Sequence, residues 1–444
     1  MNTTTPSLER LREEAESIQR GGAALKLSDA RLILAREYGF ASWRRLRAYA
    51  RRVEAHGPGL QHPYSEDVAY YEGRAVGLLA SAEDRTESAL APFRRWDAPL
   101  TPQGARSVVA REHGFSSWAG LRRHVTAMRD HSEPFARAYR LLEAQDVDGL
   151  REQLDRFPDL VAARGTNGND LLGMAAATCD ERLVALLLER GADPARANAH
   201  GWTPLHQAAY SGLPLLARLL LDAGAPADVS ARGDGGTPLI VALFWGHGEV
   251  AELLAGRGIF PRNLRAAAGL GRLDLIDELV TADGRLAPEA GAHRAFYRPH
   301  SGFPAWKPSD DRREILDEAL SWAARNDRID AFDPLVARGA SVDADVNRGT
   351  ALAWAAAGGR TRAILRLVAL GADPNRRATF GGPEHGDGTT ALHHAAEGGH
   401  LEAIRVLLDA GADPTVRDAI YDATPANWAE HFGRDEARDL LRPP

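Results

Sequence analysis

The chain has 444 residues, of which 44% are hydrophobic and 26% charged, and its formal net charge is −7. This balance is typical of a folded soluble protein, and it provides no overall positive field that would attract nucleic acid or an anionic membrane. Cys179 is the single cysteine, which excludes an intramolecular disulfide framework and a zinc site built from cysteines.

Neither a signal peptide nor a membrane span is predicted. Residues 1–6 lack the basic and then apolar pattern of a signal peptide, and apolar runs such as 183–188 end well before the roughly 20 residues that a bilayer span needs. We therefore expect a cytoplasmic protein with no membrane partner.

The first 130 residues contain an internal duplication. Segment 30–43, ARLILAREYGFASW, returns 75 positions later as segment 105–118, ARSVVAREHGFSSW. Each copy predicts a helix that ends at a glycine, then an apolar Phe anchor, a Ser cap and a second helix that begins at Trp. Two more helices are predicted between the copies, over 66–80 and 86–95. The domains expected from these patterns are 1–56, 57–130 and 131–444.

Each duplicated unit also has the outline of a helix-turn-helix, which binds DNA through a basic second helix. The phosphate contacts would then be Arg44, Arg45, Arg47, Arg51 and Arg52. The alternative is a packing module with a solvated basic face, in which Trp and Phe form the core. The net negative charge of the chain favours the packing module and argues against nucleic acid as a partner.

From about residue 135 the chain repeats a pair of motifs. Gly-Ala-Asp-Pro begins at Gly191, Gly371 and Gly411, with variants at Gly224 and Gly339, and most neighbouring copies lie 32 to 34 positions apart. Thr-Pro-Leu-His, or a variant of it, opens a helix in each unit, because threonine caps free backbone amides and proline fits the first helical position. An apolar second helix follows, and the glycine ends it in a left-handed conformation.

These paired motifs resemble the ankyrin repeat, whose consensus joins Thr-Pro-Leu-His to a Gly-Ala-Asp ending over about 33 residues. The resemblance covers about nine units between residues 135 and 441. It implies an all-α solenoid of helix-turn-helix units that share one continuous core, preceded here by the N-terminal helical domain. It also implies that the motif histidines, His206 and His393, bridge neighbouring hairpin backbones.

Two spacings exceed the repeat. Gly258 and Gly339 lie 81 positions apart, about 15 more than two repeats use, and Gly371 and Gly411 lie 40 apart, about 7 more than one repeat uses. The surplus residues fall at 293–307 and 380–387. Both segments follow a second helix and precede the next first helix, so both should extend the hairpin side of the array.

An aromatic ladder is predicted across four consecutive units, because Trp322, Trp354, His394 and Trp428 occupy the same position of the repeat. One interpretation is that large side chains fill the core between wide-spaced helices. The other is an aromatic wall on the concave groove, covered by the first insertion, which would bind a flat, cationic or peptide ligand. The candidate ligand- or partner-binding residues are Arg294, Phe296, Tyr297, Arg298, His300, Phe303, Trp306, Trp322, Trp354, Glu384, His385, His394 and Trp428.

The arginines of this set, Arg294 and Arg298, would hold a carboxylate or phosphate. Established enzyme signatures are absent from the sequence: there is no phosphate loop, no Gly-x-Ser-x-Gly elbow and no histidine pair with metal-site spacing. We therefore predict no metal and no cofactor, and the catalytic residues, if any, are unknown. Cys179 has no activating group near it in sequence.

The leading expectation is a scaffold that recognises a protein or peptide through the concave face and the hairpin insertions of units five to nine. An alternative from another class is a small-molecule-binding protein or enzyme with a pocket under the first insertion, where His293, His300, Glu384 or His385 would act as acid or base. Nucleic-acid binding by the N-terminal helices is a second alternative.

Overall fold

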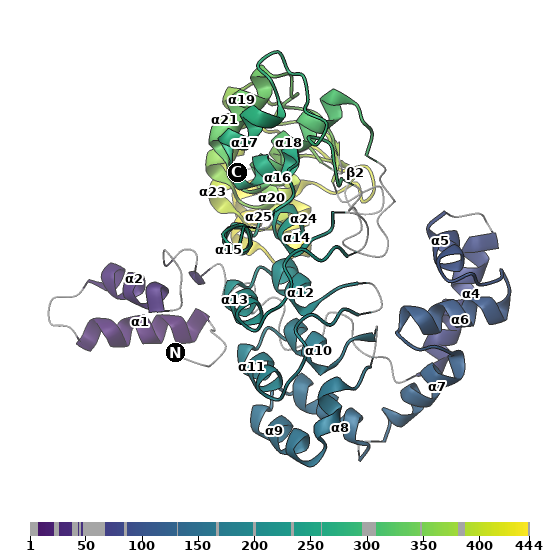
Figure 1. The fold of residues 1–444 in the computed structure, drawn as a ribbon. Helices are drawn as coiled ribbons and strands as arrows, with labels where there is room; N and C mark the ends of the chain where they lie inside the picture. The colour runs from purple at the N-terminus through teal and green to yellow at the C-terminus, as the bar shows by residue number, and fades with distance from the viewer. Residues whose placement is uncertain are drawn as a thin grey trace. The chain divides into compact units, whose positions relative to one another are not determined.

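We describe the fold from a computed structural model (Figure 1). The structure describes residues 8–21, 26–37, 43, 46–47, 67–83, 87–130, 132–165, 168–198, 201–231, 235–258, 260–294, 308–346, 349–380 and 387–442. The chain divides into two compact units, Met1–Ala231 and Arg232–Pro444. This division lies inside the repeated region, whereas the domain boundaries near residues 56 and 130 stay predictions.

The second duplicated copy has the helix, turn and helix that its sequence predicts. α7 begins at Trp118, as expected, and its cap is Ser117, whose hydroxyl accepts a hydrogen bond from the Gly120 amide. Gly114, between the two helices, has a φ of +82°, which is the left-handed conformation expected at a helix end. The helices of this region are α1 (Leu8–Gly21), α2 (Leu27–Glu37), α4 (Val68–Glu83), α5 (Glu87–Arg95), α6 (Pro102–Glu112) and α7 (Trp118–Ala127).

The repeated region of the first compact unit consists of helix pairs. A 3₁₀ helix, η1 (Pro158–Ala162), follows the first pair. The pairs are α8 (Pro134–Glu143) with α9 (Val147–Arg156), α10 (Leu171–Ala177) with α11 (Glu181–Glu189), and α12 (Pro204–Ser211) with α13 (Pro214–Asp222).

The second compact unit continues the same plan with six pairs. They are α14 (Pro238–Phe244) with α15 (Gly248–Ala255), α16 (Leu264–Leu270) with α17 (Leu273–Leu279), α18 (Arg312–Arg325) with α19 (Phe332–Ala337), α20 (Ala351–Ala357) with α21 (Thr361–Ala369), α22 (Ala391–Glu397) with α23 (Leu401–Asp409), and α24 (Pro425–His431) with α25 (Asp435–Leu441). A 3₁₀ turn, η3 (Ile329–Ala331), precedes α19. Among the described residues, the pairs therefore number nine, in agreement with the repeat count.

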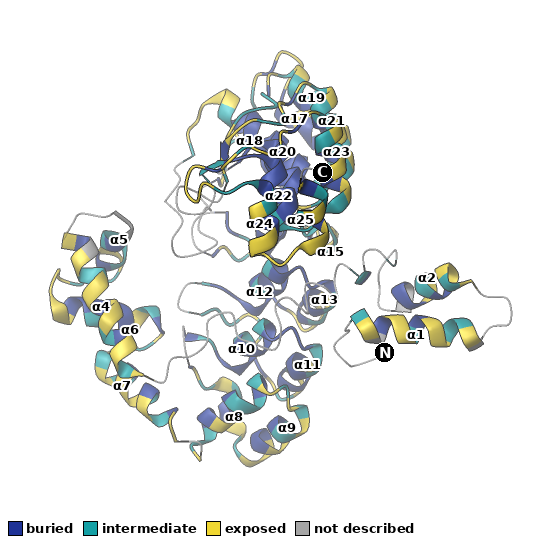
Figure 2. Cartoon of the chain, turned by 180° about the vertical axis from the view of Figure 1, so that it is seen from behind, coloured by how far each residue is buried: buried dark blue, intermediate teal, exposed yellow. Residues whose placement is uncertain are grey.

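First helices stack on first helices and second helices on second helices. In the last units α20 packs on α22 and α22 on α24, while α21 packs on α23 and α23 on α25. The first helices are the more deeply buried layer, as Figure 2 shows, and every residue of α14 is buried. Because each helix pair covers only one side of its neighbour, burial is completed by stacking, and in the second compact unit one core extends from α16 to α25.

Local chemistry accounts for where these helices begin and end. The hydroxyls of Thr203, Thr350 and Thr424 cap α12, α20 and α24. Gly371 and Gly411 follow second helices with φ values of +95° and +89°, a conformation that glycine adopts without strain. These are the roles that the two sequence motifs predict.

Two short strands flank the second predicted insertion, most of which lies outside the described residues. β1 (Ala378–Thr379) pairs antiparallel with β2 (Asp387–Thr389), and the register shifts between Ala378 and Thr379. The carboxylate of Asp345, in the preceding hairpin, accepts hydrogen bonds from the backbone N–H and the hydroxyl of Thr379, both at 2.9 Å. The hairpins of neighbouring units are therefore tied to one another.

Candidate functional site

Within the second compact unit the four residues of the predicted ladder belong to one series of ring contacts, in which Phe244 and Phe380 lie between them. Ring centroids lie 5.5 Å apart between Phe244 and Trp354 and 4.5 Å apart between Trp354 and Phe380. The ladder continues through His394, whose ring lies 3.8 Å from Phe380, to Trp428 at 5.7 Å. We call these five rings, together with Trp322 and Arg325, the aromatic cluster.

An arginine that the sequence analysis missed lies at the centre of this cluster. The guanidinium carbon of Arg325 is 3.6 Å from the ring centroid of Trp354, 4.5 Å from that of Phe244 and 5.7 Å from that of Trp322. Arg325 is 2% exposed, so these cation–π contacts are made away from water, where they are strongest. Nothing in the sequence of α18 marks this arginine, because its two nearest aromatic partners, Trp354 and Phe244, come from other units.

The burial of the ladder residues supports one of the two interpretations of the ladder. Trp322 is fully buried, and His394, Trp428 and Trp354 are 1%, 5% and 9% exposed. The four side chains therefore lie in the interior and do not form an open wall on a groove. This burial favours core packing, because Phe244 and Phe380 fill the spaces between the rings.

Arg294 requires a correction as well. Its guanidinium is buried and donates to Glu318 Oε2 at 2.5 Å, to Glu314 Oε1 at 2.8 Å and to the Ser309 carbonyl at 2.7 Å. Glu318 also pairs with buried Arg265 at 3.1 Å. Arg294 therefore balances charge inside the protein and does not hold a ligand carboxylate or phosphate.

Two indole donors in the aromatic cluster have no hydrogen-bond partner within the part of the chain that the structure describes. They are Nε1 of Trp322 and Nε1 of Trp354, both buried. By contrast, Nε1 of Trp428 donates to Asp418 Oδ2 at 2.9 Å. A buried donor without a partner costs roughly 1 to 3 kcal/mol of folding free energy. The aromatic cluster therefore packs its rings closely but leaves two indole N–H groups without hydrogen bonds.

The remaining predicted site residues lie outside the described residues. They are Phe296, Tyr297, Arg298, His300, Phe303, Trp306, Glu384 and His385.

The two motif histidines were expected to be structural. Nδ1 of His393 accepts a hydrogen bond from the Thr390 amide at 3.1 Å, and Nε2 contacts the Ala423 carbonyl of the next hairpin at 3.1 Å. Burial lowers the pKa of His393 to about 4, so the ring stays neutral and can accept and donate at once. The bridge between hairpins is confirmed for His393. His206 makes the same contact with its own cap, Thr203.

Cys179 has no features of a catalytic nucleophile. Burial, with the nearby Glu181 carboxylate, raises the pKa of the thiol to about 12, and the thiolate is the reactive form.

An exposed apolar pair that the sequence analysis did not single out lies on the last hairpin. Tyr421 is 62% exposed and Ile420 37% exposed. Both backbone amides donate to Asp418 Oδ1, at 2.6 Å and 2.9 Å, and Asp418 Oδ2 accepts from the Ala423 amide at 3.2 Å. The carboxylate thus fixes the hairpin that presents the two side chains.

Burial alone would raise the pKa of the Asp418 carboxyl. Hydrogen bonds from Tyr421, Trp428 and Ile420 outweigh this effect and leave the pKa below its ordinary value. The last hairpin is also tied to the preceding one, because the Ala419 amide donates to the Asp387 carbonyl at 2.9 Å and the Arg377 guanidinium donates to the Arg417 carbonyl. The sequence contains one signal for this exposed pair: Ile420 and Tyr421 are apolar residues between Asp418 and Asp422 in a predicted turn.

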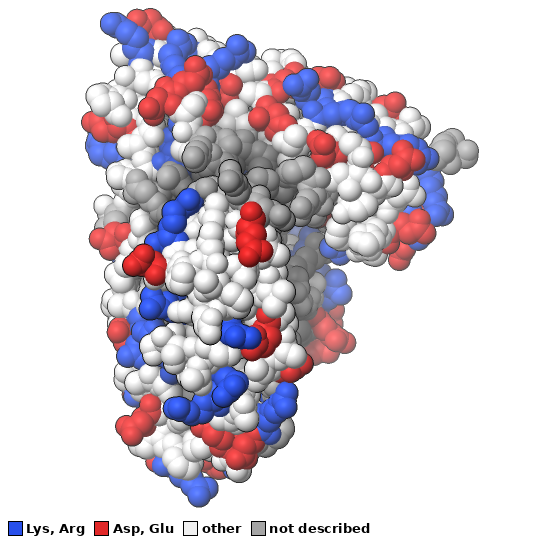
Figure 3. All heavy atoms as spheres, turned by 90° about the vertical axis from the view of Figure 1, so that its right-hand side faces the viewer, with Lys and Arg blue, Asp and Glu red and all other residues white. Residues whose placement is uncertain are grey.

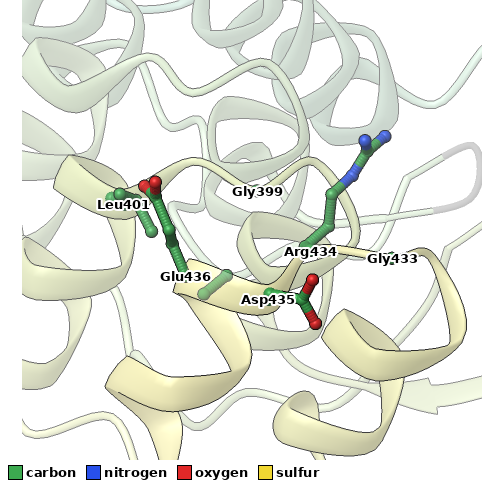
Figure 4. A pocket seen from close by; sticks show the side chains of 7 residues that line it. Gly399, Leu401, Gly433, Arg434, Asp435 and Glu436 are labelled. Atoms are coloured by element: carbon green, nitrogen blue, oxygen red, sulfur yellow. The ribbon is translucent and has the colours of Figure 1, made fainter.

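A shallow hollow of about 310 Å³ lies between the last two helix pairs, lined by Leu401, Arg434, Asp435 and Glu436 among others. Figure 4 shows the Arg434 side chain pointing away from the carboxylates of Asp435 and Glu436. Its Nε donates to the Glu397 carbonyl at 3.0 Å. The charged groups do not converge on one point, so this hollow has no arrangement for holding a ligand.

The charge distribution is mixed. On the face drawn in Figure 3, the basic and acidic side chains of the described residues are interspersed. In the second duplicated copy, the positions equivalent to Arg44 and Arg45 are Ala119 and Gly120. Of the helices that the structure describes, none has the length and apolarity needed to span a bilayer.

Comparison with known proteins agrees with this architecture. The family model for ankyrin repeats matches residues 157–263, 320–418 and 378–442, which together make up more than half of the chain. The chain belongs to the ankyrin-repeat family.

Similar curated proteins match over short stretches. A stretch of 120 residues, 26% of this chain, is 35% identical to the E3 ubiquitin-protein ligase Ufd4 of Drosophila melanogaster but spans 4% of that protein. Protein PhlB of Serratia liquefaciens is 36% identical over 104 residues, 23% of this chain and 45% of PhlB. Protein phosphatase 1 regulatory subunit 27 of Mus musculus is 46% identical over 55 residues, 12% of this chain and 35% of that protein. The chain therefore spans less than half the length of each of these relatives. Ankyrin repeats are in general protein–protein interaction modules.

Proposed function

We propose that this protein is a cytoplasmic binding scaffold whose partner, a protein or a peptide, contacts the hairpin side of the last array units. The observation that supports the proposal most directly is the exposed pair Tyr421 and Ile420 on a hairpin fixed by Asp418. Aromatic side chains on pre-ordered backbone make efficient anchors, because they bury a large area at low entropic cost.

The position of this pair is consistent with use as a surface. The Asp345–Thr379 contact and the Ala419–Asp387 contact connect three successive hairpins, so the surface is held together across units. The interior of the same units is filled by the aromatic cluster, so a partner would contact their surface. A partner would supply an apolar side chain to cover Tyr421 and Ile420.

A pocket for a small molecule at the aromatic cluster has weaker support, because the rings that would contact the ligand are buried against one another. Binding of nucleic acid has weaker support as well, because acidic and basic side chains are mixed on the surface of Figure 3.

The test uses the full chain as bait for a displayed library of random peptides. The affinity of each selected peptide is then measured by calorimetry against wild type, Tyr421→Ala and Ile420→Ala. Leu365→Ala is the matched control, because Leu365 is also an exposed apolar side chain, at 55%, but lies on second helix α21.

We expect Tyr421→Ala to weaken binding by roughly tenfold or more, as for an aromatic anchor, and Leu365→Ala to leave binding within about twofold. A library that yields no binder, or binders that are equally insensitive to Tyr421→Ala and Leu365→Ala, would contradict the proposal.

A further inference from the structure

The turns between first and second helices make a regular contact in units six to nine. In each of these turns, the residue after the left-handed residue donates to a backbone carbonyl of the preceding unit, two positions before that unit's own left-handed residue. The pairs, with the donor first, are Arg328 with Gly269, Arg360 with Arg325, His400 with Ala357 and Arg434 with Glu397, at 2.9 to 3.3 Å. Each of these units is therefore tied to its neighbour at the same point.

Units four and five lack this contact within the part of the chain that the structure describes. The equivalent arginine of unit five, Arg272, pairs instead with Asp274 of its own helix at 2.5 Å. The carbonyl at the equivalent position of unit four, that of Phe244, accepts from the Arg325 guanidinium of unit six at 3.3 Å. Unit four, which consists of α14 and α15 (residues 238–255), is therefore joined to the array in a different way.

Unit four is bonded to units two and three places further along the array. The Asn326 side chain of unit six donates to the Leu243 carbonyl at 2.9 Å. Nη2 of Arg360 in unit seven donates to the Gly246 carbonyl at 2.6 Å. In a regular solenoid each repeat contacts only its neighbours, so the array is bent here and the end of α14 lies against the turns that follow α18 and α20.

Most of the contacts that hold unit four in this place are polar. Besides the bonds to backbone carbonyls, Arg328 pairs with the exposed Glu252 of α15 at 2.7 Å. Such bonds are exchanged for bonds to water when two parts separate, so each one stabilises the contact only modestly. The apolar part is the ring of Phe244, whose centroid lies 5.5 Å from that of Trp354 and 6.1 Å from that of Trp322.

The apolar core of the later units is built without unit four. Its buried members begin at Leu264 and end at Leu441, and among the described residues they include side chains of α16 to α25 but none of α14 or α15. Where α14 meets α16, the Leu243 methyl groups lie over Gly269, which has no side chain to pack on them. Units five to nine therefore keep their core whether or not α14 is in place.

We propose that unit four is a detachable closure of the array. In the closed form, which the structure shows, Phe244 covers the rings of Trp322 and Trp354 beside Arg325. In the open form α14 leaves units five to seven, the core of units five to nine stays intact, and these rings become accessible. Elements that are held by few apolar contacts are the ones that open locally at low free energy.

The experiment measures how readily position 243 becomes accessible in the full-length chain. Leu243→Cys and Leu320→Cys place a thiol at two fully buried leucines of first helices, and Leu320 belongs to the core of units five to nine. Each variant is incubated with a maleimide at increasing urea concentrations below the unfolding transition. Mass spectrometry of the peptides quantifies the label and separates it from label on native Cys179.

We expect the thiol in Leu243→Cys to react about tenfold faster than the thiol in Leu320→Cys, or more. Its rate should hardly change with urea, because a local opening exposes little new surface. The thiol in Leu320→Cys should react faster as urea increases, since only unfolding of the core exposes it. Equal rates with equal dependence on urea would overturn the proposal, because α14 would then open only together with the core.

A second pair of variants, each combined with Leu243→Cys, tests which contacts hold the closure. Arg360→Ala removes the bond to Gly246 and should accelerate labelling by about three- to tenfold, as expected for the loss of one hydrogen bond. Arg434→Ala is the matched control, because it removes the equivalent turn contact between units eight and nine, far from α14, and it should leave the rate within about twofold. No acceleration by Arg360→Ala, or an equal acceleration by Arg434→Ala, would contradict the closure. This inference does not depend on peptide binding at the last hairpin.

Discussion

Glu318 is the residue whose removal should most clearly reveal how the second compact unit is held together. It is 1% exposed and bonds two buried arginines, Arg265 at 3.1 Å and Arg294 at 2.5 Å. Glu318→Ala would leave two guanidinium groups in the interior without their shared carboxylate. Breaking a buried ion pair in this way costs roughly 3 to 5 kcal/mol.

For a unit of the size of Arg232–Pro444, each kcal/mol shifts the melting temperature by about 2 to 4 °C. The expected decrease is therefore roughly 6 to 20 °C, measured by circular dichroism together with urea unfolding. Asp333→Ala is the control, because Asp333 pairs with Arg366 at the surface, with side chains 53% and 41% exposed, and such pairs contribute about 0 to 1 kcal/mol.

A third variant separates the cost of an uncompensated charge from the loss of packing. Replacing Arg265, Glu318 and Arg294 together by Met, Leu and Met removes all three charges, and it should recover most of the stability lost in Glu318→Ala. A loss below about 1 kcal/mol in Glu318→Ala would refute the reasoning. Equal losses in the single and triple variants would show that packing, and not charge, dominates.

Trp428→Phe should lower the free energy of unfolding by about 1 to 2 kcal/mol more than Trp354→Phe does, because only Trp428 loses a hydrogen bond, the one to Asp418. Equal losses of free energy in urea unfolding would contradict this difference. The pKa of Asp418 is lower in the folded than in the unfolded chain, so ionised Asp418 stabilises the fold fully above the unfolded pKa near 4, and this stabilisation is lost as the pH falls through the folded pKa. Asp418→Asn should therefore make the free energy of unfolding fall less steeply with pH on the acid side. An unchanged slope would contradict the role of Asp418 as a hydrogen-bonded carboxylate. Gly371→Val should lower the free energy of unfolding by roughly 1 to 3 kcal/mol, because φ at this position is +95°. Gly371→Asn should cost less in the same melting experiment, because asparagine tolerates this conformation. The reverse order would contradict the left-handed turn assigned to Gly371.

The sequence alone determined the fold class and the positions of the repeated helices. The reason is that helix caps, first-turn prolines and closing glycines affect only the backbone a few residues away from them in sequence. Thr203 caps its own helix and Gly371 ends its own helix whatever the rest of the chain does. The same holds for the duplicated copies, where the predicted helix beginning at Trp118 needed only Ser117 before it.

Only the tertiary structure decided what the aromatic ladder is. A spacing near 33 aligned Trp322, Trp354 and Trp428, but it could not show whether their rings face a groove or one another, because that depends on how closely neighbouring first helices approach. The contact of Arg325 with Phe244 joins residues 81 positions apart, and the pairing of Arg265 with Glu318 joins residues 53 apart. No local sequence pattern encodes such contacts, since they arise from the stacking of units. For the same reason the sequence could not show that Arg294 lies in the buried core and pairs with Glu318.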